Sequence, residues 1–133
     1  MKYFFLVFFL GTLHLNAQEH FNLNEILNSA ADKNVNVHSL CSDEYESSYL
    51  IWVKDSVKPH YHAKHTELVY VIEGSGTFYI GKKSYAIKPG DYLRIPQGQV
   101  HSFKNNSATE VKVLSVQTPE FKGQDRIWVD VEE

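Results

Sequence analysis

The sequence contains a single cysteine, Cys41, among its 133 residues. One cysteine cannot form a disulfide within the chain, so stability has to come from a packed core, a bound metal or the association of subunits. A free thiol is either reactive or a small buried side chain. We expect Cys41 to be buried, because free cysteine is among the residues most often found in protein interiors.

An excess of charge of one sign is also lacking. Lys and Arg number 13 and Asp and Glu number 16, which gives a net charge of -3. The basic residues form no stripe along the chain, whereas nucleic-acid binding depends on clustered Lys and Arg that neutralise phosphates. We therefore expect no nucleic-acid partner. A chain of this length is expected to form one domain.

No hydrophobic run is long enough to span a membrane. The apolar run from Tyr3 to Leu15 is shorter than the roughly 20 residues of a spanning helix. It follows Lys2 and precedes the small residue Ala17, which is the layout of a secretory signal peptide. We expect residues 1–17 to be a signal peptide cleaved near Ala17. The mature protein would then be exported, periplasmic or extracellular, without a stable membrane anchor.

The segment after the signal peptide predicts one short N-terminal helix. Its apolar residues have the spacing of an amphipathic helix: Leu23, Ile26, Leu27, Ala30 and Ala31. Asn22 followed by Glu25 resembles a capping box at the start of that helix. We accordingly divide the mature chain into a helix with a lead-in (18–47), a barrel (48–118) and a C-terminal strand and tail (119–133).

Short runs of β-branched and aromatic residues occupy most of the remaining chain. They are residues 48–53, 68–72, 77–80, 84–87, 92–95, 100–103 and 111–116, separated by turns rich in Gly, Pro, Asn and Lys. This spacing predicts an all-β fold, an antiparallel sandwich or barrel. Residues 68–72 are apolar on both faces, so we expect a second sheet or subunit to cover the outer one. A homodimer is the expected assembly, because sheet edges also need cover.

A cluster of histidines and a glutamate precedes the second of these runs. His60 and His62 are two residues apart and would share one face of a strand. Glu67 begins the next run, and we expect it to lie opposite the two histidines across a hairpin. His101 begins a later strand and is the expected fourth ligand. The alternative is a solvated polar turn. Mixed nitrogen and oxygen ligands suit one divalent transition metal, Fe, Mn, Ni, Cu or Zn.

The spacing of these residues resembles the two motifs of the cupin superfamily. His60-x-His62-x4-Glu67-x6-Gly74 is similar to the first motif, and Gly90-x5-Pro96-x-Gly98-x2-His101-x3-Asn105 is similar to the second. Lys54 stands where the family often has a turn glycine. The resemblance covers roughly residues 48–118. It implies a small double-sheet barrel of the jelly-roll type, with a mononuclear metal at its mouth held by the same three histidines and Glu67.

Other side chains are weaker candidates for the site. We expect His65 to lie on the surface of a turn, with a supporting role near the metal as the alternative. Most aromatic residues belong to the core, but five side chains are candidates for pocket lining: Trp52, Tyr70, Tyr79, Arg94 and Phe103. The glycines of the two motifs are expected to form turns.

Three functions are compatible with such a metal site. The resemblance implies a metal-dependent enzyme, a dioxygenase, isomerase, decarboxylase or lyase, acting on a small oxygen-bearing molecule such as a sugar or an organic acid. A non-catalytic module that binds a sugar or a metal is the main alternative, and a metal that only stiffens the barrel is the third. We favour the enzyme. Burying three imidazoles and a carboxylate without a metal would be costly, and a barrel core does not need them.

Overall fold

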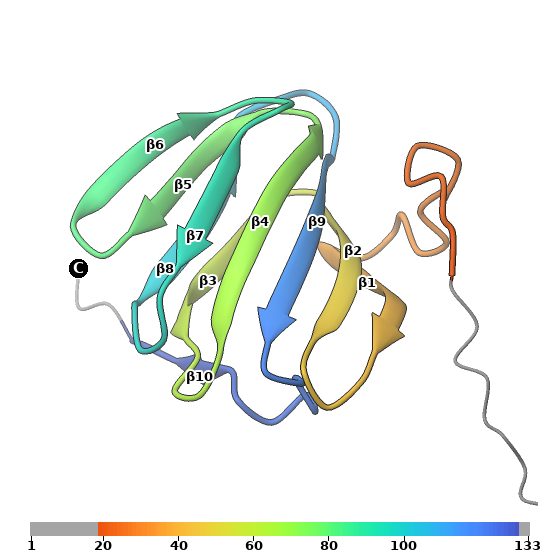
Figure 1. Ribbon diagram of the computed structural model, residues 1–133. Helices are drawn as coiled ribbons and strands as arrows, with labels where there is room; N and C mark the ends of the chain where they lie inside the picture. The colour runs from red at the N-terminus through yellow and green to blue at the C-terminus, as the bar shows by residue number, and fades with distance from the viewer. Residues whose placement is uncertain (1–18, 131–133) are drawn as a thin grey trace, which may run out of the picture.

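The protein is an all-β molecule of two five-stranded antiparallel sheets that face each other (Figure 1). This computed structural model describes residues 19–130, so the expected signal peptide lies outside the described residues. The strand order is β1-β2-β9-β4-β7 in the first sheet and β10-β3-β8-β5-β6 in the second. The strands are β1 (Val35–Ser42), β2 (Ser47–Val53), β3 (Ser56–Tyr61), β4 (Thr66–Glu73), β5 (Gly76–Ile80), β6 (Lys83–Ile87), β7 (Tyr92–Ile95), β8 (His101–Asn105), β9 (Val111–Thr118) and β10 (Ile127–Trp128).

The strand predictions agree with this arrangement, with two omissions. Each of the seven expected runs overlaps an observed strand, but β1 and β3 were not in the series. β3 carries Lys58 and Pro59, and β1 is mostly exposed, so neither has the apolar alternation that identifies a strand. Cys41, in β1, is only partly buried, with its Sγ 2.8 Å from the hydroxyl oxygen of Ser48.

The hydrophobic core lies between the two sheets. Alternate residues of each strand point inward, and the buried cluster includes Val69, Val71, Phe78, Phe103 and Val111. A side chain at position 76 would clash with this core, because a Cβ there would lie 2.4 Å from the Phe103 ring. Glycine at this position therefore allows β5 to lie directly against β8.

The prediction of an N-terminal helix is wrong. No residue of the described range 19–130 is helical, although the side chains of Asn22 and Glu25 do hydrogen-bond at 2.6 Å. A helix of about ten residues is marginal by itself in water, and tertiary contacts override its propensity. Within the described range, no helix is long and apolar enough to cross a membrane.

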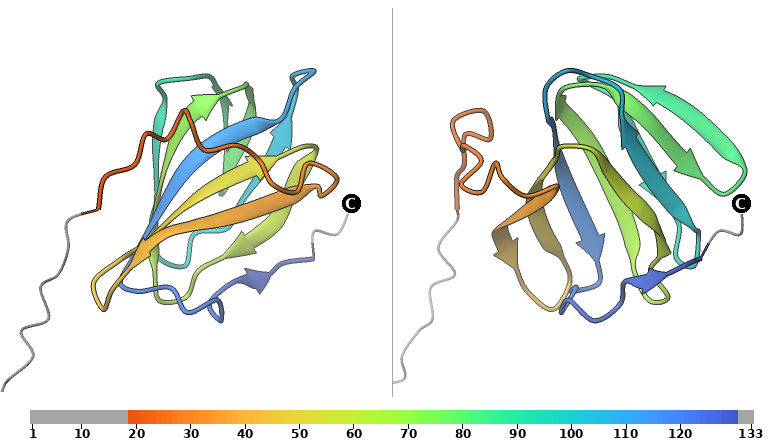
Figure 2. Two further views of the ribbon diagram at one scale, coloured as in Figure 1. Left: turned by 90° about the vertical axis from the view of Figure 1, so that its right-hand side faces the viewer. Right: turned by 180° about the vertical axis from the view of Figure 1, so that it is seen from behind.

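The segment before β1 instead crosses the outer face of the first sheet (Figure 2). Leu50, Trp52 and Lys112 are buried on that face, with exposed fractions of 0%, 4% and 3%. The Lys112 ammonium donates a hydrogen bond to the Ile26 carbonyl oxygen at 2.8 Å and lies over the Trp52 ring. This irregular segment, with turns at residues 23–25 and 31–32, therefore covers part of the outer face where a helix was expected in the chain.

β3 and β4 do not form the hairpin that we expected between the histidines and Glu67. β3 pairs with β8 and β10 in the second sheet, whereas β4 pairs with β7 and β9 in the first. The loop between them crosses from one sheet to the other. Residues of the two strands therefore meet across the barrel interior and not along one sheet.

Candidate metal centre

Four side chains converge at one end of the barrel interior. His60, His62, Glu67 and His101 are all buried, and one ligand atom from each lies within 4.8 Å of the others. His60 pairs directly with His101 between β3 and β8, while Glu67 comes from β4 of the opposite sheet. A register shift between Val57 and His60 lets both of these residues face the interior although they are three positions apart. The structure thus brings together the four residues that we expected as metal ligands.

Each imidazole is oriented by a backbone carbonyl. Nδ1 of His60 lies 2.8 Å from the Lys58 oxygen, and Nδ1 of His101 lies 3.0 Å from the Gln99 oxygen. Nδ1 of His62 lies 2.9 Å from the Asp125 oxygen. A carbonyl oxygen only accepts hydrogen bonds, so each Nδ1 carries the proton and donates it. In the neutral ring, Nε2 is then an unprotonated nitrogen with its lone pair free for a metal.

The Glu67 carboxylate faces two of these nitrogens. Its Oε2 lies 3.1 Å from Nε2 of His101 and 3.5 Å from Nε2 of His62, while its Oε1 accepts a hydrogen bond from the Ser115 hydroxyl. Nε2 of His62 is buried and has no hydrogen-bond partner among the described residues. Lone pairs of nitrogen and oxygen thus face one another in a dry site, where a cation between them would satisfy all four. The residues present fit a divalent metal.

Burial and neighbouring groups shift two pKa values in this cluster. Burial, followed by the proximity of His101, lowers the pKa of His60 to about 4, so this ring is neutral near pH 7. Burial would raise the pKa of the Glu67 carboxyl, but His101, His62 and Ser115 together hold it well below its usual range. Both shifts favour the forms that bind a metal: the neutral imidazole and the charged carboxylate.

A turn between β7 and β8 connects the two halves of the site. The Gly98 amide donates a hydrogen bond to the His62 carbonyl oxygen at 2.7 Å, and the Gln97 side chain donates one to the Ala63 oxygen. Gly98 has a φ of 75°, which favours glycine at this position. The turn that leads into His101 is therefore held against the backbone of His62.

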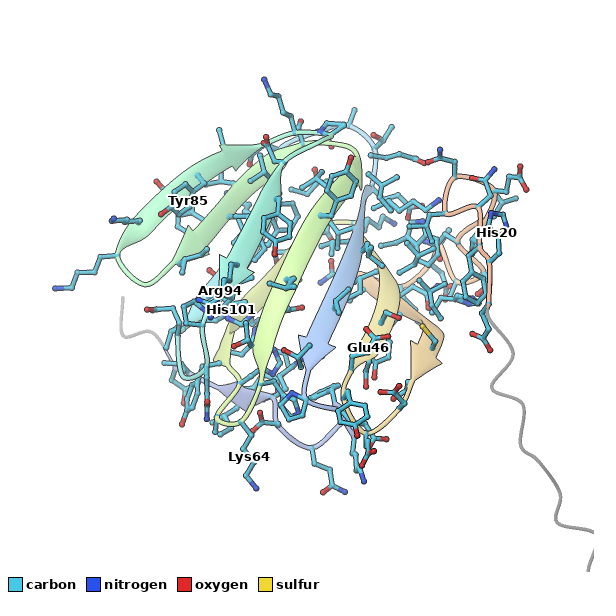
Figure 3. The ribbon with its side chains drawn as sticks, in the orientation of Figure 1. His20, Glu46, Lys64, Tyr85, Arg94 and His101 are labelled. Carbon is cyan, nitrogen blue, oxygen red and sulfur yellow. The ribbon has the colours of Figure 1, made fainter. Side chains whose placement is uncertain are left out.

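The prediction that His65 lies on the surface is wrong, because its exposed fraction is 6%. Its Nδ1 contacts the Asp125 carboxylate, and its Nε2 lies 2.8 Å from the Glu120 carbonyl oxygen. Lys64, in the same loop, points away from the barrel (Figure 3). His65 therefore holds the segment after β9 against the loop that carries His62.

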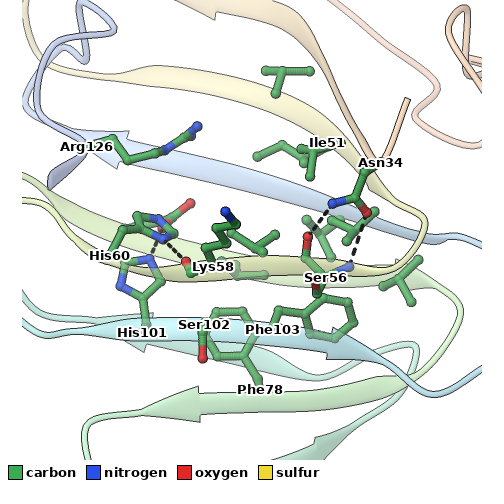
Figure 4. A pocket seen from close by; sticks show the side chains of 18 of the residues that line it. Asn34, Ile51, Ser56, Lys58, His60, Phe78, His101, Ser102, Phe103 and Arg126 are labelled. Carbon is green, nitrogen blue, oxygen red and sulfur yellow. Dashed lines mark hydrogen bonds and ion pairs between the residues drawn. The ribbon is translucent and has the colours of Figure 1, made fainter. Parts of the chain in front are cut away.

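A cavity of about 270 Å³ leads to the cluster, and His60, Glu67 and His101 line it (Figure 4). Of the five candidates for pocket lining, only Phe103 borders this cavity. The other four do not line it, because they lie on the outer faces of the sheets: Trp52, Tyr70, Tyr79 and Arg94. Strand alternation placed them there. Each occupies the position next to an inward-facing residue.

Several residues that complete the site were missed. Ser115 lies on the inward-facing side of β9, so the alternation of that strand could have identified it.

Four further residues of the site were also missed. The cavity is lined by Lys58, Arg126 and Trp128, and Asp125 orients His62. The last three belong to or adjoin a two-residue strand, β10, which pairs with β3 at Tyr61 and His60. No local pattern in the sequence predicts that pairing.

Comparison with known proteins identifies relatives of this chain. The profile of the cupin domain matches residues 49–117. A protein of Aquifex aeolicus described as uncharacterized is 35% identical over 85 residues, which cover 64% of this chain and 69% of the relative. Quercetin 2,3-dioxygenase of Bacillus subtilis is 38% identical over 53 residues, or 40% of this chain. An oxalate-binding protein of Thermotoga maritima is 34% identical over 61 residues, or 46% of this chain.

These matches span only part of the two relatives with named ligands or activities, 16% of the dioxygenase and 50% of the oxalate-binding protein. Among solved structures, a double-stranded β-helix protein of Klebsiella pneumoniae superposes with a TM-score of 0.73 at 16% identity, covering 86% of this chain and all of that one. A predicted oxalate decarboxylase of Thermotoga maritima superposes with a TM-score of 0.60 at 26% identity, covering 64% and 80%. With its domain profile, its two facing sheets and its ligand cluster, this chain belongs to the cupin family.

Proposed function

We propose that the protein is a metal-dependent enzyme acting on a small oxygen-bearing molecule. One observation carries the proposal: three of the four candidate ligands line a cavity large enough for a small organic molecule. A purely structural metal site is normally closed by its protein ligands, whereas a catalytic one keeps positions open. A divalent metal held by His60, His62, Glu67 and His101 would act there as a Lewis acid or bind O2.

The surrounding residues prepare the site for such a ligand. Lys58, Gln99 and Asp125 orient the imidazoles through their carbonyl oxygens, and Ser115 orients Glu67. These three acceptors are backbone carbonyl oxygens, in β3 and in the segments before β8 and β10, so the imidazoles need little rearrangement when a metal binds. Apolar side chains such as Phe78 and Phe103 form much of the wall of the remainder of the cavity.

The relatives indicate which of the possible reactions should be tested first. Their names include an oxygenation of quercetin and a predicted decarboxylation of oxalate. Dioxygenase and decarboxylase activities are therefore the first candidates, ahead of isomerase and lyase activities. A second function is favoured by the relative described as an oxalate-binding protein, namely capture of a small ligand without chemistry. We also retain export and homodimer formation as proposals.

Elemental analysis of protein purified without chelator or nickel affinity tests the metal requirement. About one equivalent of Fe, Mn, Ni, Cu or Zn per chain is expected. The metal-loaded protein is then incubated with phenolics, diketones and organic acids under air and under nitrogen, with the metal-free protein as control. Turnover that requires the metal supports the enzyme. Stoichiometric binding without turnover supports the capture module, and a folded protein that takes up no metal contradicts the metal-dependent enzyme.

A further inference from the structure

The walls of the cavity are mostly apolar. Valine, isoleucine and phenylalanine side chains form most of its lining, including Val53, Val69, Phe78, Ile87 and Val113. A sugar presents hydroxyl groups in every direction, and each needs a hydrogen-bond partner once it is removed from water. Apolar walls do not supply these partners. The body of the ligand is therefore expected to be apolar.

The charges that line the cavity are unbalanced. Lys58 and Arg126 line it together with Glu67, the only carboxylate among the described lining residues. Glu67 is already engaged by His101 and Ser115. A divalent metal beside Glu67 would make the excess of positive charge larger. Such an environment favours a ligand that brings negative charge.

Arg126 is positioned to meet that charge. Its guanidinium lies over the Trp128 ring, 5.8 Å from the centroid, and its Nε is buried without a hydrogen-bond partner in the described part of the chain. Within residues 19–130, Arg126 takes part in no ion pair of the structure. Figure 4 shows Arg126 at the end of the cavity that holds His60 and His101, with Asn34 and Ser56 at the other end. The planar guanidinium of an arginine in this position is suited to bidentate binding of a carboxylate.

We propose that the cavity binds an amphiphilic carboxylate, whose apolar body occupies the barrel interior and whose carboxylate lies between Arg126 and the metal ligands. This inference names the ligand class of the function proposed above and rests on it. Arg126 would be the residue that selects acids over neutral analogues, and Trp128 would hold its guanidinium in place. Both residues lie outside the part matched by the family profile, residues 49–117, so the ligand class is specified by the C-terminal segment of this chain.

Calorimetric titration of the metal-loaded protein tests this inference with three probes. Phenylacetate has an apolar body and a carboxylate, phenylacetamide lacks the charge, and galacturonate keeps the carboxylate on a polar body. The variants are Arg126→Gln, Arg126→Lys and, as matched control, Arg94→Gln, which removes an exposed arginine from the outer face of β7. Metal content and thermal unfolding are measured on the same samples to show that each variant is folded and loaded.

Phenylacetate is expected to bind the wild type more tightly than either other probe. Arg126→Gln should weaken phenylacetate binding roughly tenfold to a hundredfold and leave phenylacetamide unaffected. Arg126→Lys should give an intermediate affinity because it keeps the charge without the planar fork. Arg94→Gln should bind like the wild type.

Three results would overturn the inference: no saturable phenylacetate binding to the wild type at millimolar concentration, equal affinity in a folded and loaded Arg126→Gln variant, or tighter binding of galacturonate. The proposed function fails differently, through a wild type that holds no metal. If such a protein still binds phenylacetate through Arg126, the ligand class stands and the metal-dependent enzyme does not.

Discussion

The carbonyl oxygen of Asp125 accepts a hydrogen bond from Nδ1 of His62 at 2.9 Å, across 63 positions of the chain. The carboxylate of the same residue accepts hydrogen bonds from the amides of Ala63 and Lys64 and contacts His65. One residue of the C-terminal segment therefore both orients a candidate metal ligand and holds the loop that carries it. The segment that closes the barrel also belongs to the site.

The double change His60→Ala with His62→Ala should abolish metal binding. It removes two of the four converging ligand atoms and leaves Glu67 and His101, which are too few to hold a divalent ion tightly. Elemental analysis should show the metal content fall from about one equivalent to a background value. His38→Ala is the control, because His38 is exposed on β1 and should leave the metal content unchanged. Unchanged metal in the double variant would refute the site.

Ser115→Ala should weaken metal binding without removing any ligand. The substitution deletes the hydroxyl that donates to Oε1 of Glu67, in a position with no solvent exposure. Loss of a supporting partner of this kind typically costs about 10–100-fold in metal affinity. Competition with a chromogenic chelator measures the affinity. Ser84→Ala, on the exposed part of β6, is the matched control. An affinity equal to that of the wild type would show that Ser115 does not orient Glu67.

Asp125→Ala should destabilise the fold as well as the site. It leaves the amides of Ala63 and Lys64 without their acceptor, which is expected to lower the free energy of unfolding by about 0.5–1.5 kcal/mol for each of these partly buried hydrogen bonds. Urea unfolding of the metal-free protein measures this loss. Asp130→Ala removes an exposed carboxylate five residues further on and should change little. Equal unfolding midpoints for the two variants would contradict the role of Asp125.

The metal-free protein should lose stability as the pH falls below about 6.5. The pKa of His60 is lowered from 6.5 to about 4, so between these values the unfolded chain binds more protons than the folded one. The pKa of Glu67 is also held below its ordinary value of 4.5, so its contribution is present above that pH and is lost below it. Both effects have the same sign. Urea midpoints from pH 7 to 4 should fall steadily, and His60→Gln should flatten the part between 6.5 and 4.5.

Mass spectrometry of the protein recovered from the medium or periplasm of its native cells should give the mass of a chain whose first residue is Gln18. The basic start, the short apolar run and Ala17 predict cleavage at that point. A variant with Ala17→Arg is the control, because a large charged residue before the cleavage point should block processing. An intact Met1 in the soluble fraction of wild-type cells would contradict the prediction.

The strand pattern and three of the four candidate ligands could be predicted because they depend on short-range order. A strand places every second residue on one face, and the spacing of His60, His62 and Glu67 around a tight loop limits where their side chains can point. The positions of seven strands and the all-β class follow from the same alternation. These features need no knowledge of which distant segments meet. His101 lies 34 positions after Glu67, and it was predicted from its place at the start of a later strand and from the resemblance to the second cupin motif.

The contacts between segments that are far apart in the sequence were decided only by the tertiary structure. Residues 19–34 form an irregular segment with two turns, and the Lys112 ammonium binds the Ile26 carbonyl oxygen that a helical hydrogen bond would have used. His65 is buried because Asp125 reaches it from 60 positions away, and β10 pairs with β3 over a similar distance. A C-terminal strand was predicted within residues 119–133, but the sequence did not indicate its partner. The pairing of β10 with β3 brings Arg126 to the cavity. Which strand β10 pairs with depends on the assembled barrel and not on local propensity.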